Sequence, residues 1–269
     1  MKLLHEKESE RVLGLIFDVR NQMKGGWGEE IYHQALVARL LDEGVPTLSK
    51  PRRTLVHRGV DLYTFEPDII VWEKIILELK VLPTLKNNMF PTANEAQIIW
   101  YLKRFEKELG ILVNFAHPKV GIKRMAYQPR EMTIAENYDR IKQHLSNVDR
   151  DVLVEIRRHI LRLARFYGTG YPEIVYRQMI ALEFGHQGID CISEVNIPAR
   201  WREKDIGTQV TQHLLVDNRF LLLVRANLDL PPAYDYLRTR TYLKALGLKM
   251  GLVINFGRSQ LQIHSTAVK

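Results

Sequence analysis

Apolar residues recur at helical and strand spacings along the chain, and they predict the same order of elements twice. Each half opens with an amphipathic helix, because its apolar residues fall three and four positions apart. A glycine-containing break, a second helix, a run of strands, a third helix, an apolar strand and a short closing strand follow. The opening helices are carried by Val12, Leu13, Ile16, Phe17 and Val19, and then by Ile156, Ile160, Leu163 and Phe166. The other predicted helices span 28–43, 93–108, 172–186 and 233–248, and the closing strands lie near 120–126 and 260–264.

The two halves also align residue by residue, which indicates a tandem duplication. Residues 101–115 match residues 242–256 at an offset of 141, and residues 69–80 match residues 214–225 at an offset of 145. Small changes in offset fit insertions and deletions in loops. We therefore expect an α/β protein with two units of ordinary domain size, 1–127 and 148–269, joined by a polar linker, 128–147, that is partly helical.

The most apolar segment, 65–82, contains three charged residues that share one predicted surface. A turn at 72–74 would place Asp68 directly opposite Glu78 on antiparallel strands, and Lys80 lies on the same face as Glu78. Two carboxylates at that distance repel each other unless one is protonated or a cation lies between them. An all-oxygen pair favours Mg²⁺ or Mn²⁺ over zinc. The alternative is a salt bridge between Lys80 and either acid on a partly exposed sheet face.

Polar residues on two predicted helices share faces that could line the same site. Gln97 and Tyr101 are four positions apart in an otherwise apolar stripe, and Glu29 and Tyr32 are three positions apart. Each also has a structural interpretation. An acid in a first helical turn is favoured by the helix dipole, and tyrosines are common at the edge of a core.

Five motifs occur in order along the first unit: Gly26-x-x-Glu29-x-x-Tyr32, Pro67-Asp68, Glu78-Leu79-Lys80, Glu95-Ala96-Gln97 with Tyr101, and the "LVNF" at 112–115. Together these motifs resemble the GxxExxY protein family of the PD-(D/E)XK nuclease superfamily. The resemblance covers about residues 10–126 and implies a restriction-endonuclease-like unit, a mixed central sheet flanked by helices. It implies that Asp68 and Glu78 hold Mg²⁺ or Mn²⁺ and that Lys80, Glu29 and Gln97 are catalytic. Lys80 would position the attacking water and balance charge on the phosphate, Glu29 would support the metal site, and Gln97 would orient the water or contact the substrate backbone. Tyr32 and Tyr101 would support the site.

The second unit keeps Glu173 and Tyr176 at the positions of Glu29 and Tyr32 but loses both carboxylates. We therefore predict that it is a pseudo-nuclease that retains the fold without catalysis. Two roles are open for its arginines: binding phosphate in a bidentate manner, or pairing internally with Glu173 or Asp235. Asp68 aligns with His213, Glu78 with Leu223, Lys80 with Arg225 and Gln97 with Arg238.

Composition restricts the partners and the compartment. The chain has 269 residues, a net charge of +8 and a sequence pI of about 9.5, which favours a polyanionic partner such as nucleic acid. Its single cysteine, Cys191, excludes an internal disulfide and fits a reducing compartment. No signal peptide and no membrane-spanning segment are expected, so a cytoplasmic protein is predicted.

These observations favour a metal-dependent nuclease that hydrolyses phosphodiester bonds, DNA rather than RNA, through its first unit. The second unit would bind nucleic acid or give structural support to the first. The protein would be a monomer with an internal pseudo-twofold axis or a homodimer. No organic cofactor is expected. The alternative is a non-catalytic module on a nuclease fold that binds nucleic acid or protein, because fold alone does not establish activity.

Overall fold

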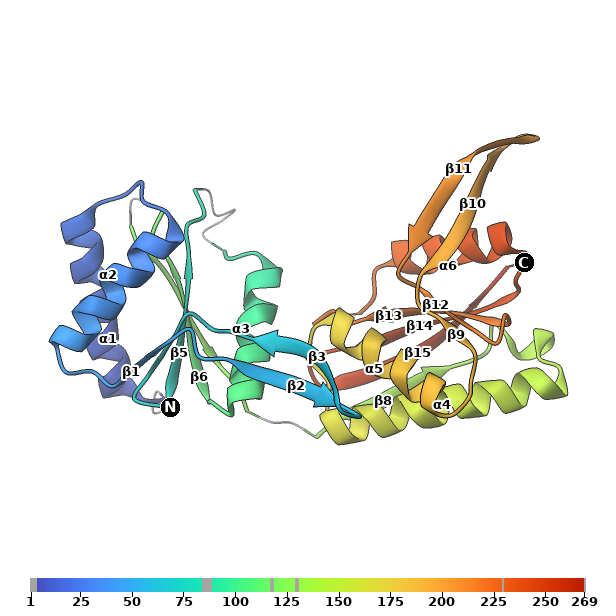
Figure 1. Ribbon diagram of the computed structural model, residues 1–269, viewed down its shortest axis with the longest axis horizontal. Helices are drawn as coiled ribbons and strands as arrows, with labels where there is room; N and C mark the ends of the chain where they lie inside the picture. Colours follow the sequence, from blue (N-terminus) through green and yellow to red (C-terminus); the bar gives the residue numbers. More distant parts are fainter. Residues whose placement is uncertain (1–3, 84–88, 117–118, 129–130, 229, 269) are drawn as a thin grey trace. The chain divides into compact units, whose positions relative to one another are not determined.

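Backbone contacts divide the chain into two units, each built around its own β-sheet (Figure 1). Unit 1 comprises Met1–Val56 and Tyr63–Pro129, and unit 2 comprises His57–Leu62 and Arg130–Lys269. The computed structural model describes residues 4–83, 89–116, 119–128, 131–228 and 230–268. Within these residues no helix is both long enough and apolar enough to cross a bilayer.

Unit 1 contains a five-stranded mixed sheet in the order β1-β4-β5-β6-β7. Strands β5 and β6 are parallel, and the other neighbours are antiparallel. This arrangement confirms the predicted mixed sheet with flanking helices. The elements are α1 (Glu6–Met23), α2 (Glu29–Asp42), β1 (Thr47–Ser49), β2 (Arg53–His57), β3 (Val60–Phe65), β4 (Ile69–Val71), β5 (Ile75–Lys80), α3 (Thr92–Phe105), β6 (Leu109–Asn114) and β7 (Gly121–Ala126).

Helices α1 and α2 pack on this sheet through one continuous hydrophobic core. Val12, Ile16 and Val19 are buried there as predicted, and each fully buried aliphatic side chain contributes about 1.5–3 kcal/mol. The prediction was wrong for Phe17, which is 43% exposed, because Leu15 occupies the core-facing position instead. Phe166 in the second unit is likewise exposed, at 79%.

Unit 2 repeats the arrangement with a six-stranded sheet in the order β8-β15-β14-β13-β12-β9. Strands β13 and β14 are parallel, as β5 and β6 are in unit 1. The elements are β8 (Thr133–Asn137), η2 (Lys142–His144), α4 (Asn147–Tyr167), α5 (Glu173–His186), β9 (Cys191–Ile192), β10 (Val195–Trp201), β11 (Lys204–Thr211), β12 (Leu214–Val216), β13 (Phe220–Arg225), α6 (Ala233–Leu246), β14 (Met250–Phe256) and β15 (Gln260–Ala267).

The segment expected to be a linker, 128–147, instead contributes an edge strand to unit 2. Strand β8 pairs in parallel with β15, and Ser146 caps α4 through a reciprocal capping box with Asp149. The sequence pattern missed β8 because an edge strand needs few apolar residues. Its Glu136 instead accepts hydrogen bonds from Arg157 and Tyr138.

The hairpin β4–β5 turns at Trp72 and Glu73, within the predicted 72–74 turn. Both residues have positive φ, 50° and 55°, and the Lys74 amide donates to the Val71 carbonyl at 3.0 Å. Two positive φ angles are the signature of the type I′ turn, which matches the twist of a two-residue hairpin. The equivalent turn in unit 2, at Asp217 and Asn218, has the same conformation. The repeat therefore fixes the same strand register in both units.

A glycine allows the third helix of each unit to pack closely on the sheet. A Cβ atom on Gly110 in β6 would lie 2.5 Å from the Ile98 Cδ1 atom of α3. Gly251 in β14 meets Thr239 and Leu243 of α6 at 3.1 Å in the same way. Since α3 carries Gln97 and Tyr101, this close packing brings those side chains toward β5.

Candidate functional site

Asp68 directly precedes β4, and Glu78 lies on β5, its antiparallel neighbour in the sheet of unit 1. The pairing of Ile69 with Leu77 continues by one residue to place Asp68 opposite Glu78, as the sequence predicts. The Leu79 amide donates to Asp68 Oδ2 at 2.7 Å, which holds that carboxylate against β5. Hairpin register and one backbone hydrogen bond therefore position both acids.

Glu78 is a buried carboxylate that lacks a full set of partners. Only 2% of the residue is exposed, and its Oε2 atom has no hydrogen-bond partner among the described residues. Burial, and then the nearby charge of Asp68, raise the pKa of Glu78 to about 8. Burial also raises the pKa of Asp68 above its usual value. Both acids are thus held where their ionised forms need a cation.

Lys80 provides one positive charge beside these acids. Its Nζ atom donates to Glu78 Oε1 at 2.7 Å and lies 3.9 Å from Glu29 Oε1, at the first residue of α2. Burial would lower the pKa of Lys80, but the carboxylates of Glu78, Glu29 and Asp68 raise it. Burial raises the pKa of Glu29 as well. Three carboxylates around one ammonium leave an excess of negative charge.

The chemistry of these donors fits a hard divalent cation. No group of three or more His, Cys, Asp or Glu side chains in the described ranges forms a complete metal site. Mg²⁺ does not require one, because it commonly binds through one or two carboxylates and takes its other ligands from water and substrate phosphates. The Oε2 atom of Glu78, without a hydrogen-bond partner in the described ranges, is an open ligand position of this kind. Asp68 and Glu78 are therefore suited to hold the ion.

A family model described as the PD-(D/E)XK nuclease superfamily matches residues 6–125 and again residues 150–266. The chain belongs to the PD-(D/E)XK nuclease superfamily. The two matched regions coincide with the two sheet-containing units, so this superfamily fold occurs twice in one chain. Members of the superfamily are usually nucleases that use divalent metals.

Comparison with individual proteins adds little to the family assignment. A search of curated proteins found no match. A solved structure, "Crystal structure of SSO0001", is similar with 21% sequence identity and a TM-score of 0.32. The similarity covers 38% of this chain and 50% of that structure, so the chain spans about half of its length.

Gln97 and Tyr101 of this PD-(D/E)XK protein contact each other on α3. The Gln97 Nε2 atom donates to the Tyr101 hydroxyl at 2.9 Å. Burial, and then the charge of Glu78, raise the pKa of Tyr101 above its usual value, so the phenol stays neutral. Tyr101 therefore lies close enough to Glu78 to feel its charge. Gln97 is connected to Glu78 only indirectly, through its hydrogen bond with Tyr101.

Tyr32 lies elsewhere, in the core. Its hydroxyl donates to the Lys24 carbonyl at 2.6 Å, and its ring stacks on Phe115 with 4.5 Å between centroids. Tyr176 does the same in unit 2, where its hydroxyl donates to the Gly168 carbonyl and its ring stacks on Phe256. Because the unit without the carboxylates keeps this arrangement, we assign Tyr32 the role of holding the connection between the first two helices.

This role predicts a loss of stability in both units. Tyr32→Phe is expected to lower the free energy of unfolding by about 1 kcal/mol, the net value of one hydrogen bond. Tyr176→Phe is expected to lower it by more, because the Tyr176 hydroxyl also accepts from the buried Tyr171 amide at 3.0 Å. Denaturant unfolding of both variants measures the loss. A decrease in cleavage rate specific to Tyr32→Phe, at equal stability, would contradict the purely structural role.

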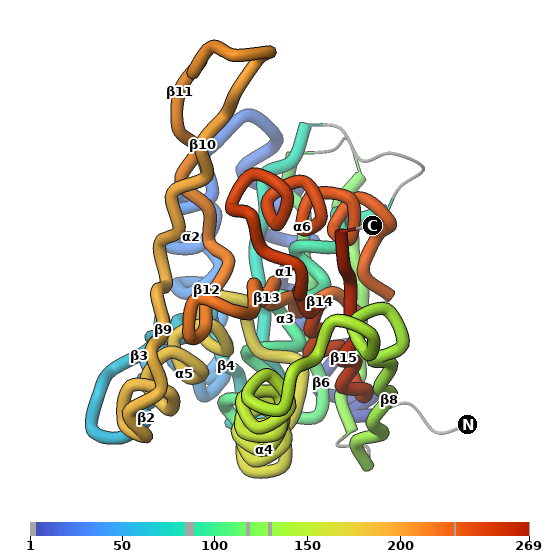
Figure 2. The backbone as a smooth tube through the Cα atoms, turned by 90° about the vertical axis from the view of Figure 1, so that its right-hand side faces the viewer, coloured from blue at the N-terminus to red at the C-terminus, as the bar shows by residue number. Residues whose placement is uncertain are grey.

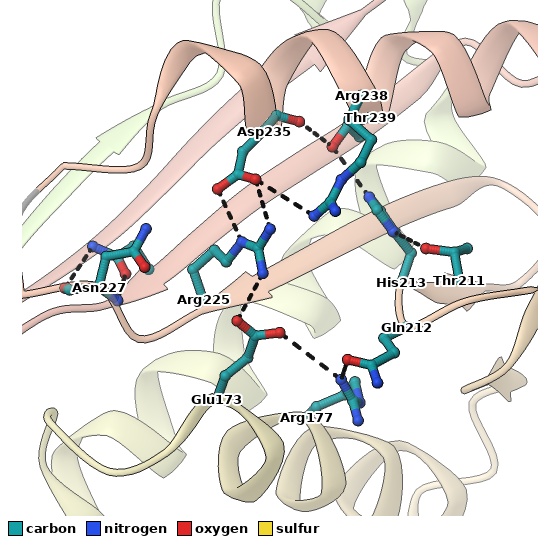
Figure 3. A network of polar contacts seen from close by, with 11 residues as sticks. Glu173, Arg177, Thr211, Gln212, His213, Arg225, Asn227, Asp235, Arg238 and Thr239 are labelled. Carbon is teal, nitrogen blue, oxygen red and sulfur yellow. Dashed lines mark hydrogen bonds and ion pairs between the residues drawn. The ribbon is translucent and has the colours of Figure 1, made fainter. Parts of the chain in front are cut away.

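The equivalent position in unit 2 is a network of internal ion pairs (Figure 3). Arg225 donates to both Asp235 oxygens at 2.9 and 2.6 Å and to Glu173 at 2.8 Å. Of the two roles left open by the sequence, the structure places Arg225 in internal pairing. Arg238 lies farther out, 3.4 Å from Asp235. Leu223 is buried and apolar, so neither strand supplies a carboxylate.

His213, which replaces Asp68, is a buried structural residue. Its ring nitrogens contact the hydroxyls of Thr211 at 2.6 Å and Thr239 at 3.2 Å. Burial, together with the charges of Arg238 and Arg225, lowers its pKa to about 3. It is therefore neutral at physiological pH, with both nitrogens engaged.

Two supporting residues of unit 1 escaped sequence analysis. The His33 Nε2 atom lies 3.2 Å from the Asp68 carbonyl and 3.2 Å from Ser49 Oγ, so α2 helps to fix the backbone that carries the acid. Asn114, at the end of β6, bonds both the amide and the carbonyl of Leu82 just after β5. Asn255 makes the equivalent contacts with Asn227. The dipeptide Asn-Phe recurs at 114–115 and 255–256, and this repetition is the sequence feature that could have identified Asn114.

Proposed function

We propose that unit 1 is a metal-dependent nuclease that hydrolyses phosphodiester bonds of nucleic acid, DNA in preference to RNA. The observation that carries this proposal is the buried Glu78 oxygen opposite Asp68 and beside Lys80, which has no hydrogen-bond partner in the part of the chain that the structure describes. A structural acid would not need an open ligand position. The resemblance to the GxxExxY family supports the same assignment.

Each residue has a physical role in this proposal. Asp68 and Glu78 would hold Mg²⁺ or Mn²⁺, which when bound lowers the pKa of a water and neutralises charge on the phosphate. Lys80 presents a fixed positive charge to the developing negative charge of the phosphate. Glu29 keeps the Lys80 ammonium near this position, at 3.9 Å. Gln97 and Tyr101 form the α3 side of the site, where an amide can orient water or substrate.

The test is a cleavage assay of the full chain on oligonucleotide duplexes and single strands of DNA and RNA. Cleavage is expected with Mg²⁺ or Mn²⁺ and not with a chelator. The double variant Asp68→Ala, Glu78→Ala, purified in the same way, is expected to show background only. Equal background from the wild type and the double variant on every substrate would refute the nuclease proposal.

A non-catalytic binding module is the second candidate function. The structure of unit 2 favours this function for that unit. Its fold persists although His213 and Leu223 have replaced both acids. With Arg225 neutralised by Asp235 and Glu173, Arg238 is the better candidate for contact with phosphate. Retained nucleic-acid binding without cleavage by the wild type would support this candidate for the whole chain.

A further inference from the structure

A short basic segment follows β1 in unit 1, beside the acids of the candidate site. Lys50 comes directly after this strand, and its amide donates to the Asp68 carbonyl at 2.9 Å. Lys50 therefore lies next to Asp68, and it adopts a left-handed backbone conformation with a φ of 46°. Few non-glycine residues adopt this conformation, and those that do are concentrated at functional sites. The backbone of Lys50 thus points to a functional role for this residue.

The side chain of Lys50 is a solvent-accessible cation close to these acids. Its Nζ atom donates to Glu30 Oε2 at 2.6 Å, and 41% of the side chain is exposed. The hydrogen bond to Glu30, assisted by the charges of Glu30, Asp68 and Glu66, raises the pKa of Lys50. The ammonium therefore stays charged at physiological pH, within reach of both the acids and the solvent.

Arg52 places a second cation on the same segment. Its guanidinium pairs with Glu66, two residues before Asp68, and 73% of the side chain is exposed. Ion pairs between exposed side chains contribute little to stability, so both cations can exchange their carboxylate for another anion at small cost. Lys80 differs, because its side chain is only 13% exposed. The segment 50–52 therefore presents two accessible cations beside the candidate metal site.

The degenerate unit provides an internal comparison for this segment. Strand β9 pairs with β12 as β1 pairs with β4, and this register aligns Leu48 with Ile192, so that Lys50 aligns with Glu194. Each of the two strands leads into a two-stranded hairpin, β2–β3 in unit 1 and the longer β10–β11 in unit 2 (Figure 2). The alignment of the two segments therefore rests on sheet pairing as well as on the sequence repeat.

Unit 2 lacks both cations of this segment, as it lacks both carboxylates of the site. Glu194 stands in place of Lys50, and Asn196 in place of Arg52, at the offset of 144. Glu194 also lacks the positive φ angle that Lys50 shows. The cations and the left-handed conformation thus accompany the acids, although the strands around them are the same in both units. A requirement of the fold alone would apply to both units, so these features belong with the chemistry of the acids.

We propose that Lys50 and Arg52 bind backbone phosphates of the nucleic-acid substrate next to the phosphate that is cleaved. This inference rests on the proposed nuclease function and adds to it the segment, 50–52, that holds the strand. The carboxylates along this part of unit 1 repel a strand unless cations offset them. Phosphate contacts carry no sequence information, so these two residues would hold strands of any base sequence. The carboxylates are those of Glu29, Glu30, Glu66, Asp68 and Glu78.

Fluorescence anisotropy of a labelled DNA duplex with the full chain, in chelator and over a range of salt concentrations, tests this contact separately from cleavage. Lys50→Gly and Arg52→Ala are each expected to weaken binding by about 5-fold or more. Each should also make the slope of log affinity against log salt less steep by about 0.9, the value for one phosphate contact. Glycine adopts a positive φ without strain, so Lys50→Gly should unfold at the wild-type temperature. Glu30→Gln, which frees Lys50 from its ion pair, is expected to tighten binding.

A matched control is Lys74→Ala, because the Lys74 side chain is 48% exposed and pairs with Glu8 in the same way. This variant is expected to bind DNA as the wild type does, and equal weakening by it would overturn the inference.

Cleavage kinetics with Mg²⁺ complete the test. The Lys50 and Arg52 variants are expected to raise KM much more than they lower kcat, because phosphate contacts away from the cleaved bond bind substrate and transition state alike. Wild-type affinity and salt slope in both variants would overturn the inference and leave the nuclease proposal standing. So would a fall in kcat at unchanged affinity, since Lys50 would then act on the charge of Asp68 alone. A wild type that neither binds nor cleaves nucleic acid would overturn both proposals.

Discussion

Substitution of Glu78 by glutamine is expected to slow phosphodiester cleavage by about 10³-fold or more, because a metal ligand supplies several kcal/mol of transition-state stabilisation. The substitution keeps the shape of the side chain and an oxygen facing Lys80, but it removes the charge that would hold the ion. The rate on a DNA duplex at saturating Mg²⁺ or Mn²⁺ measures the loss.

A matched control lies in the same hairpin. Glu73→Gln makes the identical chemical change at an exposed turn residue and is expected to leave the rate unchanged. If both variants cleaved as the wild type does, Glu78 would not be a ligand. If both lost activity, the hairpin rather than the carboxylate would be responsible.

Glu78→Gln is also expected to stabilise the metal-free fold, which excludes unfolding as the cause of lost activity. The folded pKa of Glu78, about 8, lies above the ordinary value of 4.5. Between these values the native state binds more protons than the unfolded state, so wild-type stability falls as pH rises. The variant lacks this loss, so its advantage should grow by up to about 1.4 kcal/mol per pH unit over that window. Denaturant unfolding in chelator at pH 5 and 8 measures the difference.

Substitution of Arg225 by methionine is expected to lower the free energy of unfolding by about 3 kcal/mol, because it removes the guanidinium that bonds both oxygens of buried Asp235 and one oxygen of half-buried Glu173. These acids then keep only the longer contacts with Arg238, at 3.4 Å, and Arg177, at 3.9 Å. The expected loss is a large fraction of the stability of an ordinary domain. Denaturant unfolding followed by circular dichroism measures it.

Two further variants identify the cause of this loss. Arg200→Met removes an arginine whose ion pair with Asp205 is exposed, and its effect should stay within about 0.5 kcal/mol. Arg225→Met combined with Asp235→Leu removes both charges and should recover part of the stability. An Arg225→Met variant as stable as the wild type would mean that the network is not a structural support, and binding of phosphate by Arg225 would again be the better explanation.

Much of the fold could be predicted because the repeat displays each element twice. The strand register that places Asp68 opposite Glu78 follows from the charge spacing and a polar turn, and the turn has the geometry that this register requires. The internal ion pairs of Arg225 in the second unit were predicted only as one of two possible roles, the other being phosphate binding. Sequence cannot tell whether an arginine faces a carboxylate on a helix or a ligand in solvent.

Other features depend on tertiary contacts that leave little trace in composition. Strand β8 is polar and half-exposed, so its hydrogen bonds to β15 rather than its side chains define it. His33 contacts a carbonyl, and any donor of the right reach would serve there. Tyr32 occupies a position of the motif that suggested a role in the site, but its hydroxyl donates a hydrogen bond to the Lys24 carbonyl instead.

Strand β8 has a practical consequence for dissecting the protein. A fragment that starts at 148, where the repeat begins, would lack β8 and leave β15 as a bare edge with unpaired amides and carbonyls. Such an edge is a template for pairing with other chains and leads to aggregation. It would also lack Ser146, the cap of α4. An expression fragment of the second unit should therefore start before Thr133. That start lies within the segment 128–147, which the sequence repeat alone assigns to a linker.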